Sequence, residues 1–219
     1  MKTWNIISVI TSSLIIVSAQ NVCKLPAAQI PTEWRTMEDS CTEKMKKQCI
    51  NAELGAAMTY MAMGAHFSRD TINRPGFAKM FFEAASEERG HAIKLIEYLL
   101  MRGDVFANLQ SIIQEVPKPL NTTWTDGLDA LNQALKLEAK VTNDINEIIK
   151  ECEGSRKKNK LNDYHLVDYL TNEFLQEQYT GQRDLAGKAS TLGKMIKNHG
   201  VLGEFLFDKK LLSGETLFH

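Results

Sequence analysis

Four long amphipathic segments of the chain each carry polar side chains in the middle of an otherwise apolar stripe. Residues three and four apart share one face of a helix, so a stripe at this spacing marks the side that the helix buries. In the first segment the stripe runs from Cys49 to Phe67 and is interrupted by Glu53. The pattern predicts an all-α four-helix bundle with acidic groups inside it. The polar side chains within the four stripes are Glu53, Glu88, His91, Glu138 and Gln178.

These polar residues also fall at one level of the predicted bundle. Glu53 lies fourteen residues before the end of its segment at position 67, and Glu88 lies thirteen after the start of the next at position 75. Antiparallel packing brings both to the same depth, about 20 Å from the turn. Glu138 and Gln178 have the same relation in the second hairpin. Buried carboxylates need partners, and three of them around one imidazole suit a metal cation.

The periodicity predicts helices over residues 39–68, 75–102, 123–153 and 162–199, followed by a short amphipathic helix over 201–212. Pro75 suits a first helical turn, and Gly200 suits a helix end. The link over 103–122 is longer than the usual connection of about 2–8 residues in bundles. Fully extended, it reaches about 60 Å, which exceeds the length of the second helix. We therefore expect one long crossover that makes the second and third helices parallel.

The N-terminus has the pattern of a secretory signal. Lys2 is followed by an apolar run over 6–17, too short to span about 30 Å of hydrocarbon, and by small residues up to Ala19. We expect a signal peptide over 1–19, an N-terminal extension over 20–38, the helical domain over 39–212 and a tail over 213–219. The protein is then secreted, through the ER and Golgi lumen into extracellular fluid, with no membrane partner. A net charge of −1 and a pI near 6.5 do not favour nucleic-acid binding.

The ligand types indicate which metal the site would take. Carboxylates with one imidazole suit iron or manganese better than structural zinc, which prefers cysteine and histidine. The chain has one Glu-x-x-His pair, Glu88 with His91, where di-iron oxygenases have two. Gln178 is a neutral, weaker ligand, so a second oxidised iron would be held loosely and could leave as product. Tyr60 either serves the site or simply fills the core. Glu87 either supports the site or is an ordinary surface carboxylate.

Four short segments together resemble the ferroxidase segments of ferritin heavy chains. They are Asn51-Ala-Glu53-Leu, Ser86-Glu87-Glu88-Arg89-Gly-His91-Ala, Leu137-Glu138-Ala-Lys140-Val and Gln176-Glu177-Gln178, and residues 203–209 resemble the short fifth helix of that family. With its signal peptide and cysteines, the chain is similar to the secreted heavy-chain homologue of insect ferritins. The resemblance implies a ferritin-like bundle in a shell of twenty-four subunits, mixed with a light-chain homologue, which stores a ferric oxyhydroxide core.

The resemblance also implies a role for each residue in a ferroxidase that oxidises Fe(II) to Fe(III) at a di-iron centre with dioxygen. Glu53 and His91 would bind the first iron, Glu88 would bridge, and Glu138 would bind the second. Three more residues would assist: Gln178 and Glu87 at the second iron, and Tyr60 through a hydrogen bond. The alternatives are a di-iron carboxylate oxidoreductase with another substrate, a non-catalytic bundle that binds a metal such as manganese, and a secreted signalling bundle without metal.

The chain departs from the family pattern in two places. Iron-access channels in the family carry two acidic residues near the start of the fourth helix; Asp168 matches one, but Thr171 replaces the other. Lys79 and Ser86 replace acids at positions where light chains promote mineral nucleation, so nucleation is not assigned here.

The four cysteines and a sequon give further expectations. Because the first and third helices should be antiparallel, Cys152 comes level with Cys41, and we expect a disulfide between them. Cys49 lies on the apolar stripe and is expected to be a buried thiol. Cys23 would then form an interchain bond, to a light-chain partner. Asn121-Thr122-Thr123 is a glycosylation sequon. The apolar segment over 201–212 suggests an oligomer contact.

Overall fold

A computed structural model of the chain describes residues 31, 33–35, 39–103, 113, 117–119, 121–153 and 162–214. The chain divides into two compact units, Met1–Thr32 and Glu33–His219, and the second contains all the helices described below. The expected signal peptide and Cys23 lie outside the described residues. None of the described helices is long and apolar enough to cross a membrane.

The helices agree with the four predicted segments and the predicted fifth helix. The first segment is one continuous run of α1 (Asp39–Lys44), a π-helical turn η1 (Met45–Ile50) and α2 (Asn51–Phe67). The second is α3 (Pro75–Met101) and the third α4 (Gly127–Cys152). The fourth combines α5 (Tyr164–Tyr169), a second π-helical turn η3 (Leu170–Leu175) and α6 (Gln176–His199), and α7 (Val201–Ser213) follows.

The third helix begins four residues later than the predicted position 123. Asp126 is its N-cap: its side chain accepts a hydrogen bond from the backbone N–H of Asp129 at 2.8 Å. Trp124, just before the cap, is buried against His66 with ring centroids 5.4 Å apart. The capping aspartate, rather than the apolar periodicity, therefore sets the helix boundary.

Neither π-helical turn was predicted, and the second changes which residues of the fourth segment face the core. A π turn inserts one extra residue and rotates everything after it relative to what precedes it. Leu166 and Leu170 are buried before or at the start of the turn, whereas Val167, the neighbour of Leu166, is only partly buried. Beyond Phe174 the inward line continues at Gln178. Leu166, Leu170, Phe174 and Gln178 are thus four residues apart throughout, and the wider π turn keeps this run on one face of the helix.

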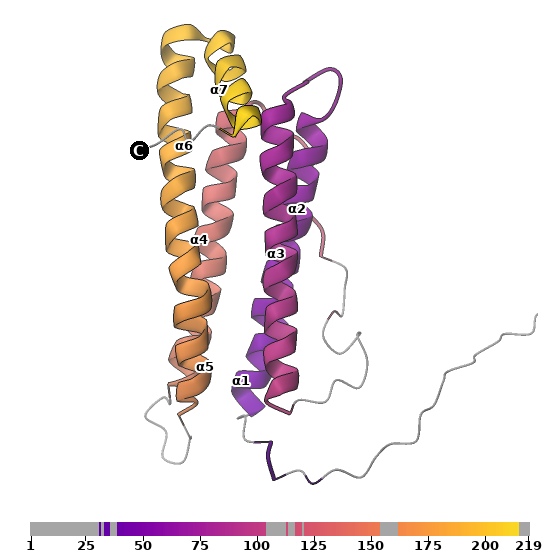
Figure 1. The fold of residues 1–219 in the computed structure, drawn as a ribbon, viewed down its shortest axis with the longest axis vertical. Helices are drawn as coiled ribbons and strands as arrows, with labels where there is room; N and C mark the ends of the chain where they lie inside the picture. The colour runs from indigo at the N-terminus through magenta and orange to yellow at the C-terminus, as the bar shows by residue number, and fades with distance from the viewer. Residues whose placement is uncertain are drawn as a thin grey trace, which may run out of the picture. The chain divides into compact units, whose positions relative to one another are not determined.

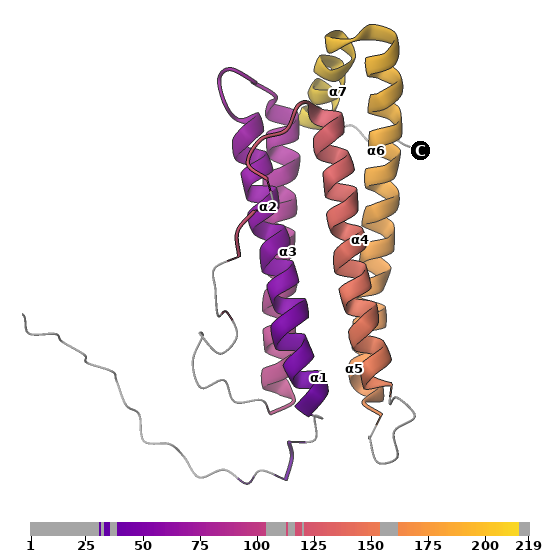
Figure 2. The same cartoon turned by 180° about the vertical axis from the view of Figure 1, so that it is seen from behind.

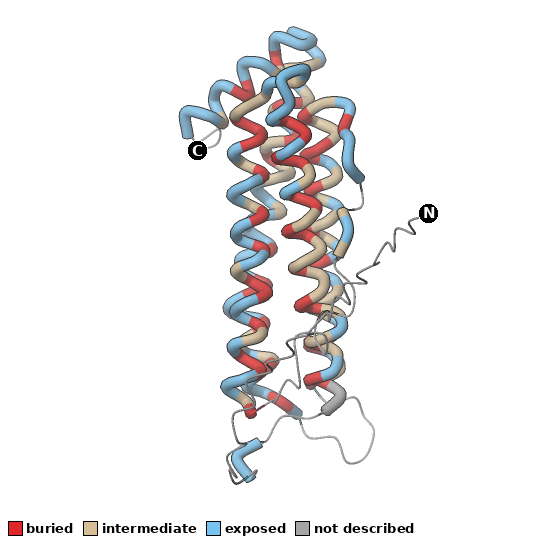
Figure 3. The backbone as a smooth tube through the Cα atoms, turned by 90° about the vertical axis from the view of Figure 1, so that its right-hand side faces the viewer, coloured by how far each residue is buried: buried red, intermediate tan, exposed pale blue. Residues whose placement is uncertain are grey.

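The bundle has the predicted single crossover. Figures 1 and 2 show α2 and α3 antiparallel, α4 parallel to α3, and α6 antiparallel to α4. Helix α4 therefore starts at the end of the bundle opposite to the one where α3 finishes, as a single crossover requires. The buried residues follow the inward sides of the helices in Figure 3, and the outer sides are exposed.

The short helix α7 is fastened to the start of α3. The side chain of Asp208 accepts hydrogen bonds from the backbone N–H groups of Gly76 at 2.8 Å and Phe77 at 3.1 Å. A Cβ atom on Gly76 would lie 1.9 Å from the backbone oxygen of Asp208, so only glycine allows this approach. Arg74 and Glu204 add an ion pair at 3.0 Å. These contacts place a carboxylate at the positive N-terminus of α3.

The expected disulfide is present. Cys41 on α1 is bonded to Cys152 on α4, with Cα atoms 5.7 Å apart, which confirms that the first and third helices are antiparallel. Cys49 is buried as a free thiol, as predicted, and its burial raises its pKa. The bridge spans 111 positions of sequence. In the chain-entropy account, closing a loop of this size stabilises the folded state by about 4–5 kcal/mol.

Candidate metal centre

Three of the predicted ligands converge at the middle of the bundle. Glu53 comes from α2, and Glu88 and His91 come from successive turns of α3. Nδ1 of His91 lies 3.2 Å from Oε2 of Glu88 and 3.7 Å from Oε2 of Glu53. One ligand atom from each residue lies within 4.8 Å of the other two, so a single cation could touch all three.

Glu53 is the residue that shows most clearly whether a cation fits this site. Its exposed fraction is 0%, and neither carboxylate oxygen has a hydrogen-bond partner among the described residues. An ionised carboxylate in an apolar core is strongly unfavourable unless it is paired or coordinates a metal. The residues present therefore fit a metal ion, and oxygen donors with one imidazole nitrogen fit iron.

Electrostatic coupling among these groups changes their pKa values. Burial raises the pKa of Glu88 to about 8, although the hydrogen bond from His91 acts in the opposite direction. Burial disfavours the imidazolium of His91, but the carboxylates of Glu53 and Glu88 outweigh it and raise its pKa to about 10. Without metal, the cluster therefore retains protons at neutral pH, which a cation must displace.

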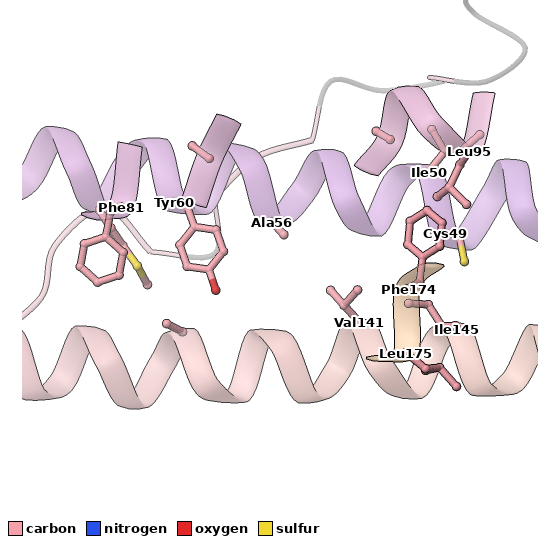
Figure 4. Packing of buried hydrophobic residues seen from close by; sticks show 14 of the residues in the cluster. Cys49, Ile50, Ala56, Tyr60, Phe81, Leu95, Val141, Ile145, Phe174 and Leu175 are labelled. Atoms are coloured by element: carbon pink, nitrogen blue, oxygen red, sulfur yellow. The ribbon is translucent and has the colours of Figure 1, made fainter. Parts of the chain in front are cut away.

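The other two helices complete the site from the opposite side. Glu138 on α4 accepts a hydrogen bond from the hydroxyl of Tyr60, which Figure 4 shows pointing from its own helix toward α4. Burial, reinforced by the charge of Glu88, raises the pKa of Glu138 to about 7. Oε1 of Gln178 accepts a hydrogen bond at 2.9 Å from Thr142, whose hydroxyl in turn accepts one at 2.6 Å from Gln182.

A cavity of about 240 Å³ joins the two sides. Six of the seven residues predicted for the site line it, and the seventh, Glu53, has no exposed surface. Glu87 is exposed overall, but partial burial of its carboxyl group and the charges of Glu88 and Glu177 raise the pKa of that group. The predicted residues that line the cavity are Tyr60, Glu87, Glu88, His91, Glu138 and Gln178.

Glu177 also belongs to this site, and the sequence reasoning assigned it no role. Its Oε2 lies 3.2 Å from Nε2 of His91, on the side of the ring away from Glu53 and Glu88. The residue lies between Gln176 and Gln178 in a segment already noted, but one position off the buried line and exposed. No spacing rule places such a side chain at the site, because the contact depends on how α6 is rotated after the π turn.

A four-helix bundle with one crossover, a cluster of buried carboxylates and one imidazole defines the class of ferritin-like metal-binding bundles. The comparisons agree. The ferritin-like domain family matches residues 46–195. A ferritin heavy chain of Papilio xuthus is 60% identical over 190 residues, 87% of this chain and 88% of the relative. The Drosophila melanogaster ferritin heavy chain is 51% identical over 189 residues, 86% of this chain and 89% of that one.

A solved structure gives the same result. The secreted ferritin of Trichoplusia ni superposes with a TM-score of 0.81 at 55% identity, covering 87% of this chain and 97% of that one. The chain belongs to the ferritin family, and its similarity is to the heavy chains. Its function is iron storage with ferroxidase activity, and iron is the metal bound at its ferroxidase site.

Proposed function

We propose that the cavity among α2, α3, α4 and α6 is the ferroxidase site. Glu53 and His91 bind the first Fe(II), Glu88 bridges, and Glu138 binds the second. Gln178 and Glu87 assist the second iron, and Tyr60 orients Glu138. The observation that carries this proposal is the convergence of ligand atoms from Glu53, Glu88 and His91 within 4.8 Å, on a cavity that Glu138 lines from the opposite helix.

Iron is the substrate in this reaction, and each Fe(II) gives up one electron. Two adjacent ions therefore supply the two electrons that reduce one dioxygen to the level of peroxide. The carboxylates favour the harder Fe(III) product, which the neutral amide of Gln178 holds less firmly than a further carboxylate or imidazole would. The second position is thus the weaker one, and product iron leaves from it toward the mineral.

The family implies an oligomeric shell, and we propose that it contains twenty-four subunits, including a light-chain homologue, around a ferric oxyhydroxide core. Helix α7 supports an oligomer contact, because Val201, Leu202, Phe205 and Leu206 are between 42% and 75% exposed in the single chain. Apolar surface of this kind marks an interface. Asp168 and Thr171 are both exposed, and an iron-access channel at Asp168 stays a prediction.

We further propose that the chain is secreted after removal of residues 1–19, that 20–38 form an extension before the ferritin-like domain of 39–212, and that 213–219 form a tail. The apolar run at the N-terminus and the Cys41–Cys152 disulfide support passage through an oxidising compartment. The relative from Trichoplusia ni is itself described as a secreted ferritin.

The test of the site uses the assembled particle. Glu88→Ala with His91→Ala should abolish the fast phase of Fe(II) oxidation, followed by absorbance of the ferric product, while particle size stays unchanged. Glu97→Ala, an exposed change on the same helix, serves as the control and should keep the parental rate. An assembled double variant that oxidised iron at the parental rate would show that the reaction takes place elsewhere.

A further inference from the structure

We infer that Glu177 is a positioning residue of the metal centre, which holds the imidazole of His91 so that Nδ1 faces the cation. The inference rests on the proposed role of His91 as an iron ligand. Glu177 is on a different helix from His91. It approaches Nε2 of the imidazole, whereas the proposed ligands Glu53 and Glu88 approach Nδ1.

The geometry divides the two ring nitrogens between two sets of partners. Nδ1 faces Glu88 at 3.2 Å and Glu53 at 3.7 Å, which are the proposed ligands. Nε2 faces Glu177 at 3.2 Å. The partners of His91 therefore come from α2, α3 and α6, and only the one on α6 lies behind the ring.

This division determines which nitrogen can bind metal. An ionised carboxylate carries no hydrogen, so its oxygen at 3.2 Å from Nε2 favours the form of the imidazole with a hydrogen on that nitrogen, because two facing lone pairs would repel each other. An imidazole bound to a metal has one hydrogen left, and if it remains on Nε2, the lone pair of Nδ1 is the one available to the cation. Glu177 thereby selects the nitrogen that points at Glu53 and Glu88.

The helix that carries Glu177 also fixes the plane of the ring. Phe174, one turn earlier, packs edge-on against His91 with centroids 5.7 Å apart and planes at 64°. Phe174 lies within the second π turn, so the rotation of the helix at that point presents both residues to His91. The aromatic contact limits rotation of the ring, and the carboxylate of Glu177 lies against its far nitrogen.

The partial exposure of Glu177 suits this role. Its side chain is 53% exposed, whereas that of Glu53 is fully buried. A carboxylate at the rim keeps contact with water and does not need the cation to compensate its charge. Carboxylate–histidine–metal arrangements of this kind orient ligands in many proteins, and loss of the outer partner typically weakens metal affinity by about 10- to 100-fold.

The experiment measures Zn²⁺ binding to the assembled, iron-free particle by calorimetry, since Zn²⁺ undergoes no oxidation and separates binding from turnover. Glu177→Ala should weaken the tighter site by about 10- to 100-fold. Glu177→Gln keeps an oxygen that accepts from Nε2–H and should restore most of the affinity. Glu173→Ala removes the same charge from an exposed position one turn earlier and should leave binding at the parental level.

A double-variant cycle distinguishes positioning from direct coordination. If Glu177 acts through His91, then adding Glu177→Ala to His91→Ala has no further effect on Zn²⁺ affinity, whereas an independent ligand would give additive losses. Additive losses, or a Gln variant as weak as the Ala variant, would overturn the inference. If His91→Ala itself left the affinity unchanged, the proposed site would fail instead, so the two failures can be told apart.

Discussion

The hydroxyl of Tyr60 on α2 donates a hydrogen bond to the carboxylate of Glu138 on α4, across the core of the bundle. Both side chains are buried, with 2% and 6% of their surface exposed. The bond connects the two helical hairpins at the level of the metal centre. The bond also compensates the charge of Glu138. Burial and the charge of Glu138 raise the pKa of Tyr60, so the hydroxyl keeps the proton that it donates.

Removing this hydroxyl should weaken the second iron position without dismantling the site. Hydrogen bonds to charged groups contribute about 1.5–3 kcal/mol, so Tyr60→Phe should slow Fe(II) oxidation roughly ten-fold. The rate is measured by stopped-flow absorbance on intact particles. Tyr179→Phe, on the exposed side of α6, is the matched control. A Tyr60→Phe particle that oxidised iron as fast as the control would mean that the bond has no part in turnover.

Metal affinity should rise between pH 6 and pH 8. A carboxyl binds a cation only after losing its proton, and the pKa values of Glu138 and Glu88 are raised to about 7 and about 8. Below these values each bound cation must displace protons, and the pKa of about 10 for His91 adds one more over the whole range. Calorimetry of Zn²⁺ binding in buffers of different ionisation enthalpy counts these protons.

The expected result is more protons released per Zn²⁺ at pH 6 than at pH 8, with affinity changing in the opposite sense. The Glu88→Gln variant has no proton to release at that position, so the number of protons released per Zn²⁺ should change less between pH 6 and pH 8. Proton release that stayed constant from pH 6 to pH 8 in the parent particle would contradict the raised pKa values.

The cap at the start of α3 should be important for stability. Asp208→Ala removes two hydrogen bonds to buried backbone N–H groups and leaves them unsatisfied, at a cost of about 1–3 kcal/mol each. We expect a lower Tm and loosening of α7, measured by calorimetric melting and by hydrogen exchange at residues 76–77. Asp208→Asn retains one acceptor oxygen and should lose less than the alanine variant. Equal melting of all three particles would refute the capping role.

Reduction of the Cys41–Cys152 disulfide should destabilise the protein. Breaking Cys41–Cys152 releases a loop constraint worth about 4–5 kcal/mol per chain, so the Tm should fall when a reductant is added. Cys41→Ser with Cys152→Ser should melt at the reduced temperature with or without reductant. Peptide mapping under non-reducing conditions checks the pairing directly, and free thiols at both positions in native protein would disprove it.

Asn121 should carry an N-linked glycan when the chain is made in a secretory cell. Asn121, Thr122 and Thr123 are all exposed, and the amide of Asn121 reaches only Gln133, by a hydrogen bond of 2.6 Å among the contacts described. Thr123→Ala breaks the sequon and should abolish the mass loss caused by a glycan-removing amidase. Thr122→Ala keeps the sequon and should still show the mass loss on treatment with the amidase. A parent chain that lost no mass on treatment with the amidase would show that the site is unused.

The sequence alone determined the helical bundle, its crossover and most of the buried polar cluster that forms the candidate metal centre. These features follow from local chemistry: Glu53, Glu88, His91 and Glu138 interrupt apolar stripes whose period is that of a helix, and a stripe fixes which face is buried. The pairing of Cys41 with Cys152 followed from their positions along the bundle axis. Two antiparallel helices with the same rise per residue bring these two positions to one height.

Only the tertiary structure decided the two π turns and the contact between Glu177 and His91. A π turn leaves little trace in the sequence pattern. It inserts one residue, which rotates the rest of the helix without changing the residue composition. The rotation determines that Phe174 and Glu177 face His91, and that Leu166 rather than Val167 is buried. Periodicity identifies the residues that a helix buries, but the partner of an exposed carboxylate depends on how neighbouring helices are turned, which is decided by packing.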